Sequence, residues 1–284
     1  MRLSLCQLFA AMNEDSAYNA NEQGELFAEP GSRERSPITP DTADATIIAA
    51  MYAPAGRDLV VLPPVARRLF ELSVDAFDAI IRAWISELPI TDSIIRYGKK
   101  ILAAAGMADD MANGTTADTA ALTRRAEIET AQRQAADAAA TDRGDSDVRT
   151  VLEAAYKVWH EIHRLMGLLR FCPNEDGVYI ARCEPDHFVL PAFGPHFQER
   201  FGETPWAIID EKRRLCLYCT TSEQPKLFSI SGNGAPSPHN TEGEWENLWR
   251  NYHKTINNES RYNPGLQRQF MPRRYWKYLT ELQE

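Results

Sequence analysis

Apolar residues recur every three or four positions along most of the first half of the chain, a spacing that predicts amphipathic helices. The longest such run, Val65–Ser86, has room for two helices, and Thr91–Ala105 has the pattern of another. Shorter helices are predicted within Met1–Met12 and over Asp41–Tyr52. Polar sequence with proline and glycine separates these two and predicts a loop. The first half is therefore expected to be helical.

The second half starts with a long helical pattern, Val148–Phe171, which the acidic residues just before it are placed to cap. After Gly177 the apolar residues come in short continuous runs, which predict strands. These strands are Val178–Arg182, Trp206–Ile209 and Leu215–Cys219, the last two joined by a hairpin turn over residues 210–214. A helix or a pair of helices is predicted over Phe188–Phe201, and further helices are predicted over Glu242–Lys254 and Pro272–Glu281. Helices beside a small sheet place the chain in the α+β class.

Residues 106–147 differ from both halves. They are rich in Ala, Asp and Thr and contain few large apolar side chains, so they combine high helix propensity with little surface to bury. An exposed helix and a connector without regular structure both fit this composition. We therefore divide the chain into a helical front region (1–105), an acidic Ala-rich connector or exposed helix (106–147) and a back module (148–284) with an Arg- and aromatic-rich tail.

The net charge of the chain is −9, which argues against a nucleic-acid partner until its distribution is considered. Residues 1–149 hold 15 basic and 23 acidic residues, a net of −8. Residues 247–280 hold seven basic residues and one acid, a net of +6. A basic tail on an acidic protein permits a local site for an anionic ligand.

Apolar segments and cysteines indicate the cellular location of the protein. No apolar run approaches the roughly 18–20 residues that a membrane helix needs. Ser4 and Gln7 interrupt the apolar start of the chain, so an amphipathic helix explains it better than a signal peptide. The odd number of cysteines, five, does not suggest a disulfide framework. We expect a cytoplasmic protein with no membrane contact.

Two short patterns resemble metal sites, but other interpretations are favoured. Cys216 and Cys219 have the spacing of a zinc or iron–sulfur knuckle, yet residues three apart on a strand point to opposite faces. His160 and His163 are one position closer together than the histidines of a zinc-protease motif. Buried core thiols and helix-surface histidines are the favoured interpretations, and neither a metal nor a cofactor is expected.

Two candidate catalytic residues each have a basic neighbour. His196 and Arg200 share a helical face, where they would grip a phosphate or carboxylate together or form a solvated surface. Asp210 lies at a strand end, where its carboxylate would be available for acid–base chemistry. Alternatively, Asp210 satisfies turn amides and pairs with Arg213. The residues themselves leave both alternatives open.

The tail interleaves cations, an amide and aromatic rings, in Arg261-Tyr-Asn263 and in the run Arg273-Arg274-Tyr275-Trp276. A guanidinium group suits phosphates and base edges, and aromatic faces stack on unpaired bases. The alternative is that the aromatic residues form the hydrophobic face of a closing helix, which is favoured for Trp276. For the three arginines the two interpretations are equally weighted.

Six motifs follow one another across residues 148–284. They run from Glu161-Ile-His163-Arg164 to Leu169-Arg170-Phe171, then His196-Phe-x-x-Arg200-Phe201, Trp206-x-Ile-x-Asp210-x-x-Arg213, Trp249-x-x-Tyr252, Arg261-x-Asn263-x-x-Leu266-Gln267 and Met271-Pro-x-Arg274-Tyr275-Trp276. In this order they resemble a bacterial family of unknown function that is assigned to DNA metabolism or DNA repair.

The resemblance implies a partner and a set of binding residues. Family members are paired with a radical-SAM protein that is itself a suspected DNA repair or modification enzyme, and related domains are fused to a uracil-DNA glycosylase-type domain. No established catalytic residue is carried over, so His196 and Asp210 stay catalytic candidates. With Arg273 from the tail, the residues expected to contact nucleic acid are Arg164, Arg170, Arg200, Arg213, Arg261, Asn263, Arg273, Arg274 and Tyr275.

Three functional hypotheses follow. In the first, the protein binds DNA or a lesion as an accessory to a radical-SAM or glycosylase partner. In the second, it is itself a glycosylase or hydrolase that acts on DNA. In the third, it is a protein-interaction subunit without DNA contact, and the acidic stretch 106–147 is its docking segment.

Overall fold

A computed structural model describes residues 3–12, 48, 62–112, 121–220, 224–230 and 244–282. The chain divides into two compact units, one formed by Met1–Pro37 and Asp58–Val158, the other by Ile38–Arg57 and Trp159–Glu284. The boundary between them falls inside one long helix. The described part of the first unit is helical and that of the second contains a small mixed sheet with helices, which confirms the predicted α+β class.

The first unit is helical throughout its described elements. They are α1 (Leu5–Ala11), α3 (Pro64–Leu72), α4 (Val74–Ile85), α5 (Thr91–Ala112), α6 (Ala121–Thr141) and the start of α7 (Ser146–Leu168). The helix predicted at the start of the chain, the pair over Val65–Ser86 and the helix over Thr91–Ala105 are all confirmed. The helix predicted over Asp41–Tyr52 lies outside the described residues except at Ile48.

Aromatic contacts join α1 to the helices that follow it. The rings of Phe9 and Phe77 stack with their centroids 5.9 Å apart. The indole nitrogen of Trp84 donates a hydrogen bond to the backbone oxygen of Leu3 at 2.9 Å. A buried indole N–H needs such a partner, because an unsatisfied polar group in a core is destabilising.

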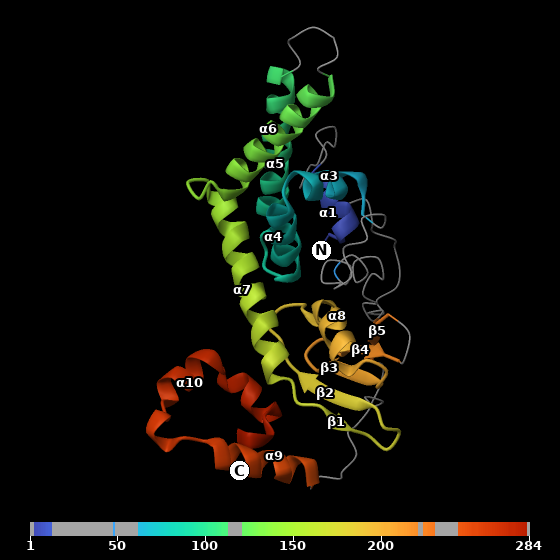
Figure 1. Ribbon diagram of the computed structural model, residues 1–284, viewed down its shortest axis with the longest axis vertical. Helices are drawn as coiled ribbons and strands as arrows, with labels where there is room; N and C mark the ends of the chain where they lie inside the picture. The colour runs from blue at the N-terminus through green and yellow to red at the C-terminus, as the bar shows by residue number, and fades with distance from the viewer. Residues whose placement is uncertain are drawn as a thin grey trace, which may run out of the picture. The chain divides into compact units, whose positions relative to one another are not determined.

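Residues 106–147 contain the end of α5 and all of α6, two long helices that run side by side (Figure 1). Ala136 and Ala140 of α6 are buried, and the hydroxyl of Tyr97 on α5 donates to the backbone oxygen of Ala140 at 3.3 Å. Small side chains allow two helices to approach closely, so α6 packs on α5 although it offers few large apolar groups.

The acidic residues before α7 cap it as predicted. Asp145 Oδ1 accepts hydrogen bonds from the backbone nitrogens of Asp147 at 2.8 Å and Val148 at 3.1 Å, which satisfies amides that lack a partner in the first turn of a helix. Arg96 of α5 pairs with Asp147 at 2.7 Å, and Lys100 pairs with Asp145 at 3.1 Å. The start of α7 is thus fixed to α5.

The sheet of the second unit has five strands in chain order. They are β1 (Cys172–Pro173), β2 (Tyr179–Cys183), β3 (Trp206–Asp210), β4 (Leu215–Cys219) and β5 (Lys226–Ser229). β2 and β3 are parallel and are connected by α8 (Leu190–Phe201), whereas the other pairs are antiparallel. The predicted hairpin between β3 and β4 is confirmed.

Aromatic side chains fill the space between α8 and the sheet. Trp206 is fully buried, and its ring centroid lies 6.0 Å from that of Phe197 and 6.3 Å from that of Phe201. α8 comes so close to the sheet at Gly194 that an added Cβ atom would meet Pro225 at 3.3 Å. Because β2 and β3 are parallel, the loops that follow them lie at the same end of the sheet. Asp210 is the last residue of β3 at this end.

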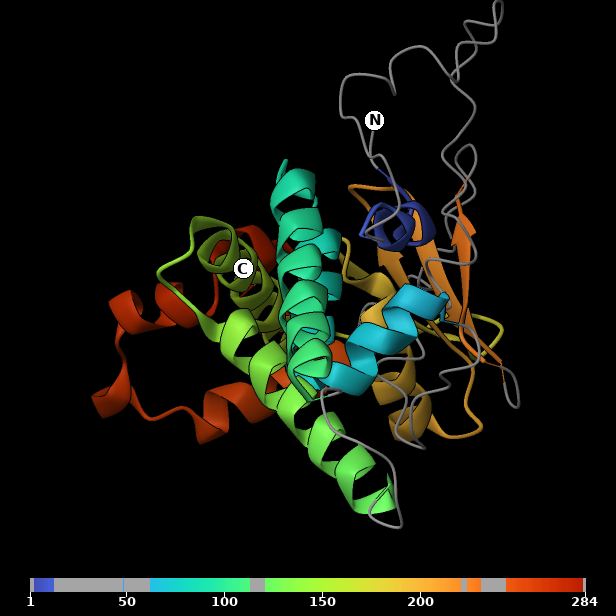
Figure 2. The ribbon, with the colours of Figure 1, turned by 90° about the horizontal axis from the view of Figure 1, so that it is seen from above.

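The described residues after the sheet, 244–282, form short helical pieces. They are α9 (Glu244–Ile256), the 3-10 helix η2 (Glu259–Arg261), α10 (Pro264–Phe270) and the 3-10 helices η3 (Arg273–Tyr278) and η4 (Thr280–Leu282). Figures 1 and 2 show these pieces following one another around an open course that returns to the side of α9. In place of the α-helix predicted from Pro272, the structure has the two 3-10 helices η3 and η4. None of the described helices is long and apolar enough to cross a membrane.

Candidate nucleic-acid interface

The turn after β3 is organised by Asp210 and Arg213. The Arg213 backbone nitrogen donates to Asp210 Oδ1 at 3.0 Å, and its guanidinium Nη1 donates to Oδ2 at 2.9 Å. Arg214 then adopts the left-handed conformation, with φ of 53°, and closes the turn into β4. Burial raises the pKa of the Asp210 carboxyl, and Arg213 only partly opposes that effect.

The loop between β2 and α8 receives side chains from two directions. Arg213 donates to the backbone oxygens of Pro185 at 3.0 Å and Asp186 at 2.8 Å. From α7, the Glu161 carboxylate accepts the backbone N–H groups of Asp186 at 2.8 Å and His187 at 2.9 Å. Backbone groups of a loop need such partners when they are buried, so Arg213 and Glu161 together hold this loop in place.

Glu161 also anchors the end of the chain. Its side chain is only 3% exposed, and its Oε1 accepts the hydroxyl of Tyr275 at 2.5 Å. Arg274 lies 3.4 Å from the same oxygen and pairs with Asp186 at 2.6 Å. A buried carboxylate is tolerated only when donors surround it, and here two amides, a phenol and a guanidinium do so.

A second anchor lies near the C-terminal end, at Glu281. Its carboxylate accepts two hydrogen bonds from Arg170, at 2.6 Å and 3.2 Å, and one from the indole nitrogen of Trp249 at 2.9 Å. The Arg250 guanidinium donates to the backbone oxygen of Thr280 at 3.2 Å. These contacts join the first half of α9 to η4. The two ends of the segment between them therefore lie close together.

We call this segment, residues 247–273, the arm. It contains five basic residues and one acid, a net of +4. Of the thirteen large hydrophobic residues that are exposed in the described part of the chain, seven lie on the arm. They are Leu248, Trp249, Tyr252, Ile256, Tyr262, Leu266 and Phe270. The arm therefore presents aromatic and basic side chains together.

The sequence profile of a family described as a domain of unknown function, DUF4130, matches residues 120–281. The chain belongs to this family. The matched region starts at α6 and includes the sheet, both anchors and the arm. The family description assigns no activity. Neither the curated proteins nor the solved structures contain a match to the chain.

Within the DUF4130 region, five of the nine predicted nucleic-acid contacts are engaged by the protein itself. Arg170 pairs with Glu281 and Arg213 with Asp210. Arg274 and Tyr275 contact Glu161. Asn263 caps α10, where its side chain accepts the backbone N–H of Leu266 at 3.0 Å. The side chains of these five residues thus make contacts within the protein that hold the surrounding elements in place.

The other four predicted contacts are not held in this way. Arg261 and Arg273 are exposed on the arm, Arg200 is exposed on α8 and Arg164 is half-buried on α7. No ion pair within the described ranges involves any of them, although the Arg273 guanidinium lies 5.7 Å from the Trp276 ring centre. Arg261 and Arg273 are thus the predicted contacts best placed to meet a ligand on the arm.

The two catalytic candidates lie in different settings. His196 is exposed on α8, whereas Asp210 is fully buried with both oxygens hydrogen-bonded to Arg213. Among the described residues, no hydrogen bond joins His196 to Asp210. A general base must reach its proton, so this geometry favours the alternative in which Asp210 satisfies the turn and pairs with Arg213.

Sequence reasoning did not single out Glu161 and Glu281 as site residues. In the sequence, Glu161 stands out only as the first residue of a family motif, and its burial against the β2–α8 loop has no local signal. Glu281 lies 111 positions from its partner Arg170. The cysteine and histidine patterns produce no cluster of metal ligands within the described ranges, and Cys216 and Cys219 are buried and not joined in a disulfide.

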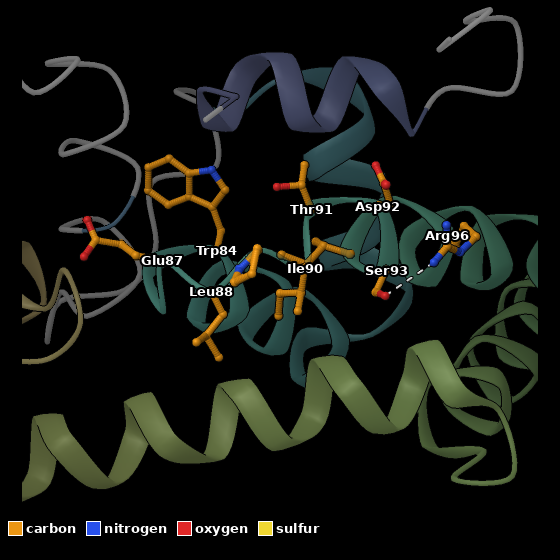
Figure 3. A pocket seen from close by; sticks show the side chains of 10 residues that line it. Trp84, Glu87, Leu88, Ile90, Thr91, Asp92, Ser93 and Arg96 are labelled. Carbon is orange, nitrogen blue, oxygen red and sulfur yellow. Dashed lines mark hydrogen bonds between the residues drawn. The ribbon is translucent and has the colours of Figure 1, made fainter. Parts of the chain in front are cut away.

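A hollow of about 510 Å³ lies in the first unit, between the end of α4 and the start of α5 (Figure 3). Its charged residues are Glu87, Asp92 and Arg96, and the guanidinium of Arg96 is already paired with Asp147. Two acids oppose an anionic ligand, and the hollow lies outside the DUF4130 region. It forms no part of the candidate interface.

Proposed function

We propose that this protein binds DNA through its arm. The observation that carries the proposal is that one short segment combines exposed aromatic rings with Arg261 and Arg273, neither of which forms an ion pair within the described ranges. Trp249, Tyr252, Tyr262 and Phe270 are 38–68% exposed, and Arg261 and Arg273 are exposed in the same segment. Basic residues supply the affinity for phosphates, and aromatic faces add contacts to bases.

Local charge supports DNA as the ligand despite the acidic composition of the chain. The arm has a net charge of +4, and Glu259 is its one acid. Both buried carboxylates that anchor the ends of the arm, those of Glu161 and Glu281, are surrounded by donors. They therefore contribute little negative field to the exposed surface.

The resemblance adds a biological setting to this proposal. A DNA-binding subunit would present its substrate to an enzyme, and the resemblance names a radical-SAM or glycosylase protein in that role. The accessory role and a cytoplasmic location are parts of the proposal. Because the Asp210 carboxylate is buried and hydrogen-bonded to Arg213, we favour DNA binding over an independent glycosylase or hydrolase activity.

The proposal is tested with the full chain and a fluorescein-labelled DNA oligonucleotide in an anisotropy titration. We expect the Arg261→Ala/Arg273→Ala double variant to bind roughly tenfold or more weakly at about 0.1 M salt, because each lost phosphate contact lowers affinity several-fold. The matched control is Arg143→Ala/Arg149→Ala, which removes two exposed arginines from the first unit and should bind as the wild type does.

Two results would overturn the proposal. One is an absence of measurable DNA affinity in the wild-type protein. The other is equal affinity of the wild type and the Arg261→Ala/Arg273→Ala variant, since the cations of the arm would then play no part.

A further inference from the structure

Trp249 is exposed and yet held in one orientation. It keeps 38% of its surface exposed, and its indole nitrogen donates to Glu281 at 2.9 Å. The Arg170 guanidinium carbon lies over the ring, 5.3 Å from the centroid. The hydrogen bond fixes the edge of the ring and the cation covers one of its faces.

The two residues that hold Trp249 are themselves firmly placed. Arg170 donates two hydrogen bonds to the Glu281 carboxylate, the fork-like geometry of a strong guanidinium–carboxylate pair. It also donates to the backbone oxygen of Gly167 at 3.0 Å. The Glu281 side chain is only 4% exposed. Trp249 is therefore held by a partly buried ion pair, that of Arg170 and Glu281.

Tyr252 continues the aromatic surface one turn further along α9. Its ring centroid lies 5.6 Å from that of Trp249 with a tilt of 36°, and the residue is 52% exposed. A ring whose orientation is fixed before binding loses little conformational freedom when a ligand stacks on it. Trp249 is such a ring, and with Tyr252 beside it on a segment of net charge +4 it suits a planar ligand attached to an anionic backbone.

We propose that Trp249 and Tyr252 form a stacking platform for an unpaired nucleobase. This inference rests on the proposed function and narrows it to single-stranded or locally unpaired DNA. Bases within a duplex are stacked on one another and offer only their edges in the grooves. An aromatic platform can use only a base whose face has been freed from the stack.

The platform is tested by comparing a single-stranded oligonucleotide with a duplex of the same length. We expect Trp249→Ala to weaken binding of the single strand on the order of tenfold, the usual effect of removing a stacked aromatic side chain. Binding of the duplex and the dependence of affinity on salt should not change, because no phosphate contact is lost. Trp249→Phe keeps a stacking face but loses the hydrogen bond to Glu281, so its affinity should lie between those of Trp249→Ala and the wild type.

The matched control is Phe228→Ala, which removes an aromatic residue that is 47% exposed on β5, away from the arm. It should leave both affinities unchanged. Trp249→Ala also loses the hydrogen bond to Glu281, so binding is compared well below the unfolding temperature of every variant. Circular dichroism there should match the wild type, so that a change in binding reports the platform rather than the fold.

Two results would contradict the stacking platform while leaving the proposed DNA binding by the arm intact. In the first, Trp249→Ala binds the single strand as tightly as the wild type while Arg261→Ala/Arg273→Ala binds weakly. In the second, Trp249→Ala weakens single-strand and duplex binding equally, which would indicate a structural role for the ring. A wild-type protein that binds neither form of DNA would overturn both proposals.

Discussion

The hydroxyl of Tyr275 donates a hydrogen bond of 2.5 Å to the carboxylate of Glu161 and so joins the last turns of the chain to α7. Tyr275 is buried, and Glu161 also holds the backbone of the β2–α8 loop. One carboxylate thus connects a helix, a loop at the edge of the sheet and the end of the arm.

Removing this hydroxyl should destabilise the protein. We expect Tyr275→Phe to lower the free energy of unfolding by about 1–3 kcal/mol, because a buried carboxylate loses a donor while the ring remains. Urea denaturation measures the change. Tyr262→Phe is the control, since Tyr262 is 68% exposed and its substitution should have almost no effect. Equal stabilities of the two variants would contradict the role given to Glu161.

Asp210 is expected to matter for stability rather than for turnover. Asp210→Ala leaves the Arg213 guanidinium, only 12% exposed, without its carboxylate and should cost roughly 3–5 kcal/mol. Asp210→Asn keeps one acceptor and should cost less. Glu199→Ala, an exposed acid on α8, serves as the control. An Asp210→Ala protein with wild-type stability that had lost an activity on DNA would instead favour a catalytic role.

The Glu281 anchor should make stability depend on pH. Burial alone would raise the pKa of Glu281, but the hydrogen bonds from Arg170 and Trp249 outweigh it and the pKa is lowered from its ordinary value of 4.5. A carboxyl with a lower pKa in the folded state stabilises the protein above its unfolded pKa. That contribution is lost as pH falls through the folded pKa.

Urea denaturation at a series of values from about pH 6 down to about pH 3 tests this relation. The free energy of unfolding should fall below pH 4.5, and Glu281→Gln should show a smaller fall than the wild type because it has no proton to take up at that position. Glu199→Gln should follow the wild-type curve. Parallel curves for Glu281→Gln and the wild type would show that the anchor adds no pH-dependent stability.

The elements that the sequence predicted are those with a strong local pattern. The apolar runs that became β3 and β4 are buried along almost their whole length, so their composition alone indicated strands. β5 alternates exposed and half-buried residues over four positions, and β1 has two residues, one of them Pro173. Such short edge strands exist because a neighbour pairs with them, and no local pattern reveals the neighbour.

The candidate site was predicted only in part, for a related reason. Residue type and motif order pointed to Arg261, Arg273 and Arg274, but not to which of them the protein uses internally. Arg274 pairs with Glu161, 113 positions away in the sequence, and so supports the fold. Arg261 is exposed. Long-range pairing of charges needs the structure, because a single sequence carries no record of it.

The dependence of DNA affinity on salt tests the central claim most directly. For a single-stranded oligonucleotide the wild-type protein should lose affinity steadily with increasing salt. Each removed phosphate contact should reduce the slope of log K against log salt by about 0.7, so Arg261→Ala/Arg273→Ala should have a clearly shallower slope and Arg143→Ala/Arg149→Ala an unchanged one. An affinity that does not depend on salt, or one slope for all three proteins, would contradict binding of DNA by the arm.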